Sequence, residues 1–182
     1  MTPQSGPDSF EAVMLPHLDA AYNLARWLVR DPDAARDVVQ ESMMRALTYF
    51  SRFKGINARA WLLQIVRNAA YATARLNRGP QLVSITDFED AQDGAALPAA
   101  LHDPADDPER ALIREQERRS VDALLESLPV ELRETLVLRE LEEFSYKEIA
   151  QITETPIGTV MSRLWRARQL FAASAQAALG KP

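Results

Sequence analysis

The chain has 182 residues, is 47% hydrophobic and 26% charged, and carries a formal net charge of -5. This composition is typical of a globular protein rather than a disordered one, and the length allows one domain or two small ones. The chain contains no cysteine, which excludes disulfides, thiolate metal sites and cysteine nucleophiles. The start has no basic segment followed by an apolar one, and no apolar run is long enough to span a bilayer, so we expect a cytoplasmic protein without membrane insertion.

Charge is distributed unevenly along the chain. Residues 1–80 carry ten basic and seven acidic side chains, residues 81–108 carry seven acidic and no basic ones, and residues 109–182 carry eleven basic and twelve acidic ones. The middle segment contains three prolines and lacks helical periodicity, which is typical of a linker. In both flanking blocks apolar residues recur at spacings of three and four, and no run alternates like a strand. We therefore predict an all-α protein with two small helical domains, residues 1–80 and 109–182, joined by a flexible acidic linker over residues 81–108.

The first block is predicted to contain two amphipathic helices before residue 50. Asp8 and Glu11 can cap the first, and Pro16 should kink or divide it. Asp31 followed by Pro32 predicts the cap and first position of the next helix. The opposite face of that helix carries polar residues that the pattern alone assigns to solvent. The expected core positions are Phe10, Val13, Met14, Leu18, Ala21, Tyr22, Ala25, Leu28, Val29, Ala35, Val38, Val39, Met43, Ala46 and Leu47.

A basic segment follows. Residues 42–86 contain seven basic side chains and no acid, with aromatic residues interleaved. Guanidinium groups neutralise phosphates and aromatic rings stack on unpaired bases, so this segment is predicted to bind nucleic acid. Trp61 is expected to lie in the core. At 100° per residue, one helix face collects Gln64, Arg67, Asn68, Tyr71, Arg75 and Arg78, and the opposite, dry face collects Trp61, Leu62, Ile65, Ala69, Ala72 and Leu76.

The last block ends in a predicted helix-turn-helix. The stretch "SYKEIAQI" predicts a short amphipathic helix, "TET" a break, and Pro156 the opening of the next helix. In such a pair the second helix enters the major groove, although helix pairs with a basic second member also occur in other all-α proteins. The predicted buried stripe is Val160, Leu164, Ala167 and Phe171, and the predicted outward residues are Gly158, Met161, Ser162, Trp165, Arg166 and Gln169.

Three stretches carry a resemblance to one family. "LPVELRETLVLRELEEFSYKEIAQITETPIGTVMSRLWRARQLF" closely resembles the fourth-region helix-turn-helix of bacterial sigma factors of the extracytoplasmic function family. "DPDAARDVVQESMMRAL" resembles their core-polymerase-binding second region, and "FKGINARAWLLQIVRNAAYATARLNR" their minus-ten recognition segment. The resemblance covers nearly the whole chain outside the linker, with the motifs in the family's order.

The resemblance implies partners and residue roles. The expected partners are core RNA polymerase, through its β′ clamp coiled coil and β flap, promoter DNA, and an anti-sigma factor. Asp37, Gln40 and Glu41 would dock on the clamp coiled coil. The loop formed by Lys54, Gly55, Ile56, Asn57 and Ala58 would capture a flipped base of the melted minus-ten element, with Asn57 as its polar reader. Arg67, Tyr71, Arg75 and Arg78 would hold the promoter backbone, and the minus-thirty-five element would be met by Gly158, Thr159, Met161, Ser162, Arg163, Trp165 and Arg166.

Two departures from the family pattern stand out. Family members usually have a glycine and an apolar residue where this chain has Glu154 and Thr155. This turn often needs positive φ, which costs a residue other than glycine about 1 kcal/mol. Met161 stands where a cation is frequent, so an apolar contact is expected there.

The resemblance also implies that the acidic linker threads the polymerase channel, where its seven acids would mimic RNA. In the free protein these acids would repel DNA.

Nothing in the sequence predicts catalysis. His17 and His102 are unaccompanied, and no glycine-rich loop precedes a helix, so we expect no enzyme activity, metal or cofactor. The prediction is a noncatalytic initiation factor that directs RNA polymerase to promoters. Two alternatives are a helix-turn-helix regulator that acts without polymerase, and a sigma-like decoy that only binds an anti-sigma protein. The motifs of the first block disfavour the former, and the retained arginine face and recognition helix disfavour the latter.

Overall fold

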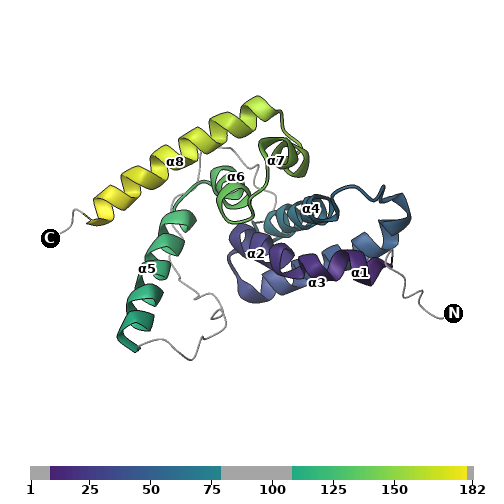
Figure 1. The fold of residues 1–182 in the computed structure, drawn as a ribbon, viewed down its shortest axis with the longest axis horizontal. Coiled ribbons are helices and arrows are strands. Elements are labelled where there is room, and N and C mark those ends of the chain that lie inside the picture. Colours follow the sequence, from purple (N-terminus) through teal and green to yellow (C-terminus); the bar gives the residue numbers. More distant parts are fainter. Residues whose placement is uncertain (1–8, 79–107, 180–182) are drawn as a thin grey trace.

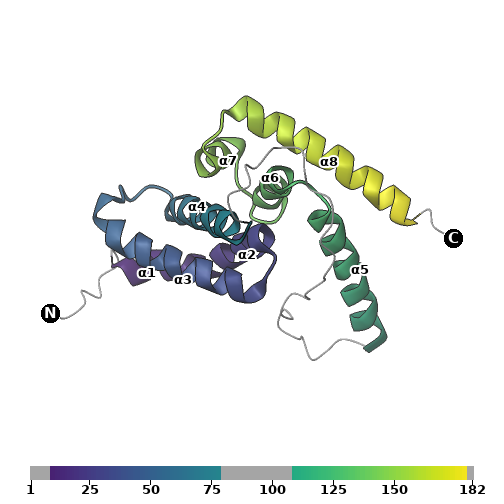
Figure 2. The same ribbon diagram turned by 180° about the vertical axis from the view of Figure 1, so that it is seen from behind.

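The computed structural model describes residues 9–78 and 108–179, which form helices and no strand. Two bundles, one from each described range, lie against each other (Figures 1 and 2). The N-terminal bundle consists of α1 (Phe10–Met14), the 3-10 turn η1 (Leu15–His17), α2 (Leu18–Val29), α3 (Pro32–Tyr49), the 3-10 turn η2 (Phe50–Arg52) and α4 (Ala58–Arg78). The C-terminal bundle consists of α5 (Pro108–Glu126), α6 (Val130–Glu140), α7 (Tyr146–Thr153) and α8 (Ile157–Leu179).

Local signals set the first helix boundaries. Pro16 lies in η1, so it divides α1 from α2 as predicted. The cap of α1 is Ser9, whose side chain accepts a hydrogen bond from the Ala12 amide at 3.2 Å. The predicted cap Asp8 lies outside the described residues, and Glu11 lies inside the first turn instead of capping it. The side chain of Asp31 accepts from the Ala34 amide at 2.7 Å, and Pro32 is the first residue of α3, which confirms that prediction.

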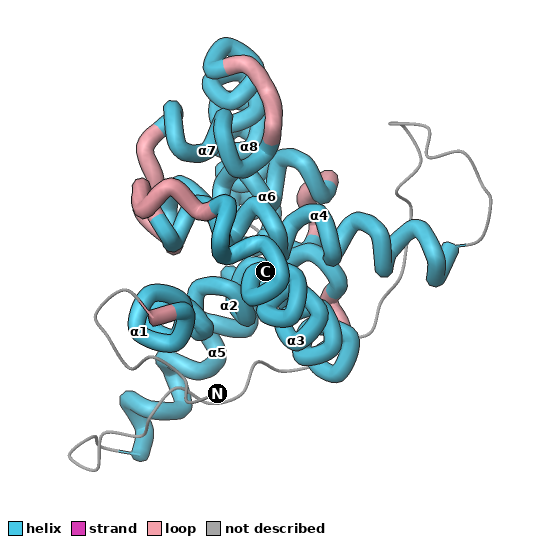
Figure 3. The backbone as a smooth tube through the Cα atoms, turned by 90° about the vertical axis from the view of Figure 1, so that its right-hand side faces the viewer, coloured by secondary structure: helices cyan, strands magenta, loops and turns pink. Residues whose placement is uncertain are grey.

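The core of the N-terminal bundle lies between α2, α3 and α4, which pack against one another. Most of the predicted core positions are buried there or pack against buried residues. Two predictions are wrong, because Leu47 is 58% exposed and Leu76 is 83% exposed. Leu47 follows the buried Ala46 and therefore lies about 100° around α3 from the core-facing stripe. Leu76 lies in the last turns of α4, which project beyond the other helices (Figure 3).

The C-terminal bundle is built around α8, which packs against α5, α6 and α7. Helix α5 begins at Pro108, so the last residue of the predicted linker belongs to a helix; residues 81–107 of that linker lie outside the described residues. Ser145 and Glu148 form a capping box at the start of α7. Glu154 is the C-cap that follows the last residue of α7, and it has φ 54° and ψ 41°, so the positive φ expected for this turn is confirmed. Helix α8 then starts directly after Pro156, as predicted.

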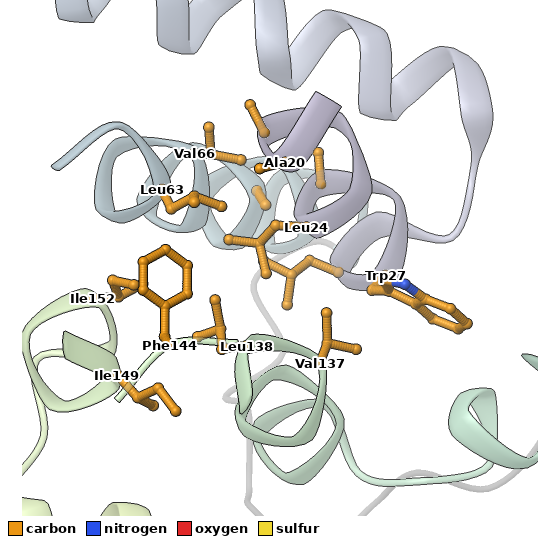
Figure 4. Packing of buried hydrophobic residues seen from close by; sticks show 14 of the residues in the cluster. Ala20, Leu24, Trp27, Leu63, Val66, Val137, Leu138, Phe144, Ile149 and Ile152 are labelled. Atoms are coloured by element: carbon orange, nitrogen blue, oxygen red, sulfur yellow. The ribbon is translucent and has the colours of Figure 1, made fainter. Parts of the chain in front are cut away.

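One apolar core continues across the two bundles. Helix α4 packs on α7, and α2 packs on α6. Figure 4 shows Phe144 and Ile152 of the C-terminal bundle facing Leu63 of α4, and all three side chains are buried. Burial of apolar surface stabilises such contacts by about 25 cal/mol per Å². The bundles are therefore held together by packing as well as by polar contacts.

Candidate nucleic-acid and polymerase interfaces

The outer face of α3 is exposed. Asp37, Gln40 and Glu41 all lie on it, and Glu41 accepts a hydrogen bond from Arg45 at 2.7 Å. The structure adds Met44, which is 62% exposed, and Leu47 to this face. Acidic side chains beside exposed apolar ones suit a protein partner better than DNA, whose phosphates repel carboxylates. The spacing of Gln40, Met44 and Leu47 by four and three residues is the sequence signal that could have identified this stripe.

The loop between η2 and α4 is sharply bent. Gly55 has φ 73° and Asn57 has φ 50°, so two of three consecutive residues adopt left-handed conformations. Lys54, Gly55 and Ile56 are exposed, whereas Asn57 and Ala58 are half-buried. The Asn57 Oδ1 accepts from the Ala60 amide at 3.1 Å, which caps α4. Its Nδ2 donates to Glu148 of α7 at 2.5 Å, so both polar atoms of the predicted base reader already have partners.

A row of aromatic rings supports this loop. Phe10 meets Phe50 edge to face with centroids 5.4 Å apart, Phe50 stacks on Phe53 at 6.0 Å, and Phe53 lies 5.1 Å from Trp61. Trp61 is partly buried and packs against the core, in line with the expectation for that residue. These rings therefore pack against one another next to the loop, and they do not form an exposed surface on which nucleic-acid bases could stack.

The basic face of α4 meets a buried carboxylate. The Arg67 Nε donates to Glu134 of α6 at 2.6 Å, and the Tyr71 hydroxyl donates to the same carboxylate at 3.2 Å. Glu134 is fully buried. Burial raises the pKa of Glu134, and its two partners oppose that rise. Burial lowers the pKa of Arg67, but the neighbouring Glu134 outweighs it and the net pKa is raised. Arg75 is exposed, and Arg78 ends α4 with its side chain outside the described part of the chain.

Three further glutamates of the C-terminal bundle contact the N-terminal bundle along the same side. Glu154 accepts from Gln64 at 2.8 Å and from Asn68 at 3.4 Å. Glu142 pairs with Arg59, which also donates to the Glu142 carbonyl at 2.7 Å. Glu148 is the third, through its bond to Asn57. Glu134, Glu142, Glu148 and Glu154 were not identified from the sequence, because each partner in the N-terminal bundle, including Asn23, which donates to Glu142 at 3.5 Å, lies 63 to 119 residues away along the chain.

The outer face of α8 is open. Gly158, Met161, Ser162, Trp165 and Arg166 are all exposed, as predicted, and Trp165 is 65% exposed. The exposed Ile157 precedes Met161 and Trp165 at spacings of four, so an apolar ridge accompanies the polar residues. The buried stripe of Val160, Leu164 and Ala167 is confirmed, with Phe171 half-buried at its end.

Two residues predicted to meet the upstream element lie differently. Thr159 is half-buried in the first turn of α8, where its amide bonds to the Pro156 carbonyl at 3.0 Å. Arg163 is half-buried, and one of its guanidinium nitrogens is buried with no hydrogen-bond partner in the described ranges. Its charge acts on Glu134 and opposes the rise in that carboxyl's pKa. Arg163 therefore points toward α6, whereas Arg166 points outward.

Buried Arg133 links the two bundles where the end of α5 meets α2. The Arg133 guanidinium donates to the carbonyls of Leu125 and Glu126 at the end of α5 and of Leu128 in the turn that follows. It also donates to the Trp27 carbonyl of α2 at 2.8 Å. Burial lowers the pKa of Arg133 to about 10, which leaves it protonated at neutral pH. Arg30 of the N-terminal bundle also donates to the Glu126 carbonyl. This cluster is structural rather than a nucleic-acid site.

Neither a metal cluster nor a membrane span is found in the ranges that the structure describes. Within residues 9–78 and 108–179 no group of three His, Cys, Asp or Glu side chains is placed to hold a metal ion. None of the described helices is long and apolar enough to cross a bilayer.

Comparison with known proteins agrees with this arrangement. The family models of sigma-70 region 2 and sigma-70 region 4 match residues 14–79 and 118–171. The RNA polymerase sigma-H factor of Pseudomonas aeruginosa is 34% identical over 165 residues, which span 88% of this chain and 83% of that protein. The ECF RNA polymerase sigma-E factor of Escherichia coli is 39% identical over 137 residues, or 73% of this chain and 69% of that one.

A solved structure extends the likeness to the fold. The sigma factor RpoE of Bartonella quintana, crystallised with the anti-sigma factor NepR, superposes with a TM-score of 0.72 at 28% identity over 94% of this chain and 98% of that one. The sequence matches cover both bundles and the superposition covers nearly the whole chain. The chain therefore belongs to the sigma-70 family and is a sigma factor of the extracytoplasmic function type.

Proposed function

We propose that this chain directs core RNA polymerase to promoters through three surfaces. The outer face of α3 docks on the β′ clamp coiled coil, the loop 54–58 and the basic face of α4 read and hold the minus-ten element, and α8 reads the minus-thirty-five element. The domain boundaries proposed from the sequence, 1–80, 81–108 and 109–182, separate the two promoter-reading units. The protein acts without catalysis, in the cytoplasm, and meets the β flap as well as the clamp.

The observation that carries this proposal is the outer face of α8. Met161, Trp165 and Arg166 are exposed within the first three turns after the helix-turn-helix bend. In such motifs the early residues of the second helix reach base edges in the major groove. A large aromatic side chain that is 65% exposed gains little from core packing, so a partner surface accounts for its position better.

An anti-sigma factor is the proposed regulatory partner. The similar RpoE was solved in complex with the anti-sigma factor NepR. The apolar ridge of Ile157, Met161 and Trp165 and the apolar part of the α3 face give this chain exposed surface for such a protein. Binding there would compete with DNA at α8 and with polymerase at α3.

Core binding and initiation distinguish this function from its alternatives. We expect the protein to be retained by immobilised core polymerase and to support runoff transcription from its own promoters. A DNA-binding regulator would bind promoter DNA but would not be retained by core polymerase, and a decoy would support no transcript.

Variants of the α3 face sharpen that experiment. Asp37→Ala with Glu41→Ala should lose retention by core polymerase, because both carboxylates lie on the proposed docking face. Asp19→Ala with Asp33→Ala is the matched control: it also removes two exposed acids, one from the first turn of α2 and one from the first turn of α3, where Asp33 pairs with Arg36 at 2.6 Å. Equal loss in both variants would assign the effect to net charge and argue against a docking face.

A further inference from the structure

The exposed surface of α8 has an apolar side and a basic side. Ile157, Met161 and Trp165 recur every fourth residue, and their side chains are 45%, 53% and 65% exposed. At 100° per residue these positions fall within about 80° of one another around the helix axis. Arg166 is also exposed, and it lies about 140° around the axis from Met161. The apolar ridge and the guanidinium group therefore flank the exposed surface on opposite sides.

Small residues lie between the apolar ridge and Arg166. Gly158 and Ser162 are both exposed there. A Cβ added at Gly158 would meet no atom of the described residues within 4 Å, so packing inside the protein does not require a glycine at this position. The Ser162 hydroxyl donates to the Thr159 carbonyl of its own helix at 3.0 Å, so its proton is not free for a base. The middle of this surface therefore allows a partner to approach the helix backbone closely, and the two flanks supply the contacts that distinguish one partner from another.

The charge around the apolar ridge favours DNA as that partner. From Thr155 to the end of the chain the sequence contains no acidic residue, whereas Arg163, Arg166 and Arg168 all belong to α8. Lys147 of the preceding helix α7 is exposed as well. Basic side chains attract the phosphates that line a DNA groove. The apolar ridge is thus part of a surface whose charge already suits the DNA backbone.

Thymine is the base that an apolar side chain recognises in the major groove. Its C5-methyl group is the one methyl group among the donors and acceptors that the base pairs present there. An apolar side chain placed over the amino, carbonyl or ring-nitrogen groups of other bases displaces water from them without replacing the lost hydrogen bonds. Met161 therefore favours thymine in two ways, because it buries the methyl group and disfavours the other bases.

We infer that α8 reads thymines of the minus-thirty-five element through contact of their methyl groups with the apolar ridge, and that Met161 is the central specificity-determining residue. This inference rests on the function proposed above for α8. From Ile157 to Trp165 the ridge extends about 12 Å along the helix axis, at 1.5 Å per residue. Successive bases of one strand are about 3.4 Å apart, so the ridge spans about four base pairs. More than one thymine is expected in that stretch on the strand that faces the ridge, while Arg166 faces the other strand and can donate to a guanine there.

The first test removes single methyl groups from the DNA. Holoenzyme is assembled from core polymerase and the full chain, and its Kd is measured on a promoter that gives a runoff transcript. Each thymine of the upstream element is replaced in turn by deoxyuridine, which lacks only the methyl group. Loss of one buried methyl contact should weaken binding about fourfold, which corresponds to about 0.8 kcal/mol. The losses should fall on one strand within a stretch of about four base pairs. Unchanged binding after every replacement would overturn the inference.

The second test assigns the methyl contacts to Met161. Met161→Gln keeps the length of the side chain but removes its apolar end, and Met161→Leu keeps an apolar side chain. Leu170→Gln is the matched control, because Leu170 is also exposed on α8 but lies about 180° around the axis from Met161. In Met161→Gln, deoxyuridine at one position should no longer weaken binding, whereas Met161→Leu and the control should keep the fourfold loss. This ratio compares two DNAs on the same protein, so it does not depend on the folded fraction. A Met161→Gln protein that retains every methyl effect would contradict the role of Met161.

Selection from random sequences tests the base preference itself. The upstream element of the same promoter is randomised, and the duplexes that holoenzyme retains are sequenced. The unchanged protein should enrich thymine at the methyl-dependent positions. Met161→Gln should replace one of these thymines by adenine, which a glutamine side chain recognises with two hydrogen bonds. The same enriched sequence for both proteins would overturn the inference and would leave the apolar ridge to a protein partner.

Transcription separates failure of this inference from failure of the proposed function. If the unchanged protein is not retained by core polymerase and supports no runoff transcript, the proposed function is refuted, and the inference that rests on it is refuted as well. Normal transcription from a promoter whose upstream element shows no dependence on methyl groups would refute the reading of thymine alone.

Discussion

The two surfaces proposed to read DNA in this sigma factor resemble each other in sequence and differ in the folded chain. Both combine arginines with a nearby aromatic residue on one side of a helix: Arg67 and Tyr71 on α4, Arg166 and Trp165 on α8. The α8 pair is exposed to solvent, whereas the α4 pair binds Glu134 beneath α6. The difference teaches that residue type determines which ligand a helix face can bind, while packing determines whether the face is accessible.

The ion pairs of the two surfaces differ in the same way. The Arg67–Glu134 pair is almost completely buried, whereas the pair between Arg168 of α8 and Glu140 of α6 has both side chains 50% exposed. An exposed pair of this kind contributes about 0 to 1 kcal/mol. A buried pair is not a large net gain either, but removing one partner leaves an uncompensated charge, which is costly. The stability of the protein is therefore far more sensitive to mutation of the covered α4 face than of the open α8 face.

The largest effect is expected from Arg67→Ala on the covered face. It leaves Glu134 buried without its cation, which should cost the docked state about 3 kcal/mol or more. The loss should appear as a lower free energy of unfolding in urea, or as a larger radius of gyration if the bundles separate to hydrate Glu134. Arg75→Ala, on the same helix but exposed, should stay within about 0.5 kcal/mol of the unchanged protein. If Arg67→Ala leaves both the free energy of unfolding and the radius of gyration unchanged, the α4 face is no more sensitive to mutation than the α8 face.

Arg166→Ala should have its main effect on DNA rather than on stability. If the side chain reads a base, binding to the upstream promoter element should weaken by about 1 to 3 kcal/mol. The free energy of unfolding should not change, because Arg166 is exposed. Titration of promoter DNA and of scrambled DNA provides the measurement. An equal loss on both sequences would assign Arg166 to a phosphate contact.

Asn57→Ala tests the loop that precedes α4. The variant should open duplex promoters more slowly than the unchanged protein, with a much smaller defect on templates already mismatched across the minus-ten element. It also removes the cap of α4, which costs about 1 kcal/mol of stability. Asn57→Ser retains a capping oxygen and so separates the two effects. Equal defects of either variant on both templates would argue against base capture.

Trp165→Ala should produce the smallest change in stability. The side chain is 65% exposed and lies off the buried stripe of α8, so the free energy of unfolding should change by no more than about 0.5 kcal/mol. Promoter use should nevertheless fall, while circular dichroism shows unchanged helical content. A large drop in melting temperature would mean that Trp165 packs in the core and that the open face of α8 is smaller than the structure indicates.

Much of the fold was predictable because its signals act over one helical turn. Asp31 and Pro32 start α3 through a hydrogen bond to the third residue along the chain, and Pro16 interrupts the first helix through its own ring. The stripe of Val160, Leu164 and Ala167 follows from helical period alone. The left-handed turn at Glu154 was expected from the family resemblance. These features depend on neighbours in sequence, so tertiary contacts did not need to be known.

The error at Leu47 marks the limit of that reasoning. Periodicity gives the direction of the apolar stripe but not its width, which depends on how closely α2 and α4 approach α3. The buried stripe of α3 turned out to consist mainly of small residues, Ala35, Ser42 and Ala46, with Val38, and it leaves Leu47 outside. The same residue then became part of the exposed face assigned to a partner.

The sequence by itself determined the helices, the family and the chemistry of the basic faces. Only the tertiary structure decided that the α4 face is covered, because the decision rests on pairs such as Arg67 with Glu134 and Asn57 with Glu148, which lie 67 and 91 residues apart. Arg133 likewise binds a carbonyl 106 residues before it. Each of these residues reads as an ordinary charged or polar side chain in its own helix, and its partner is defined only when the two bundles dock.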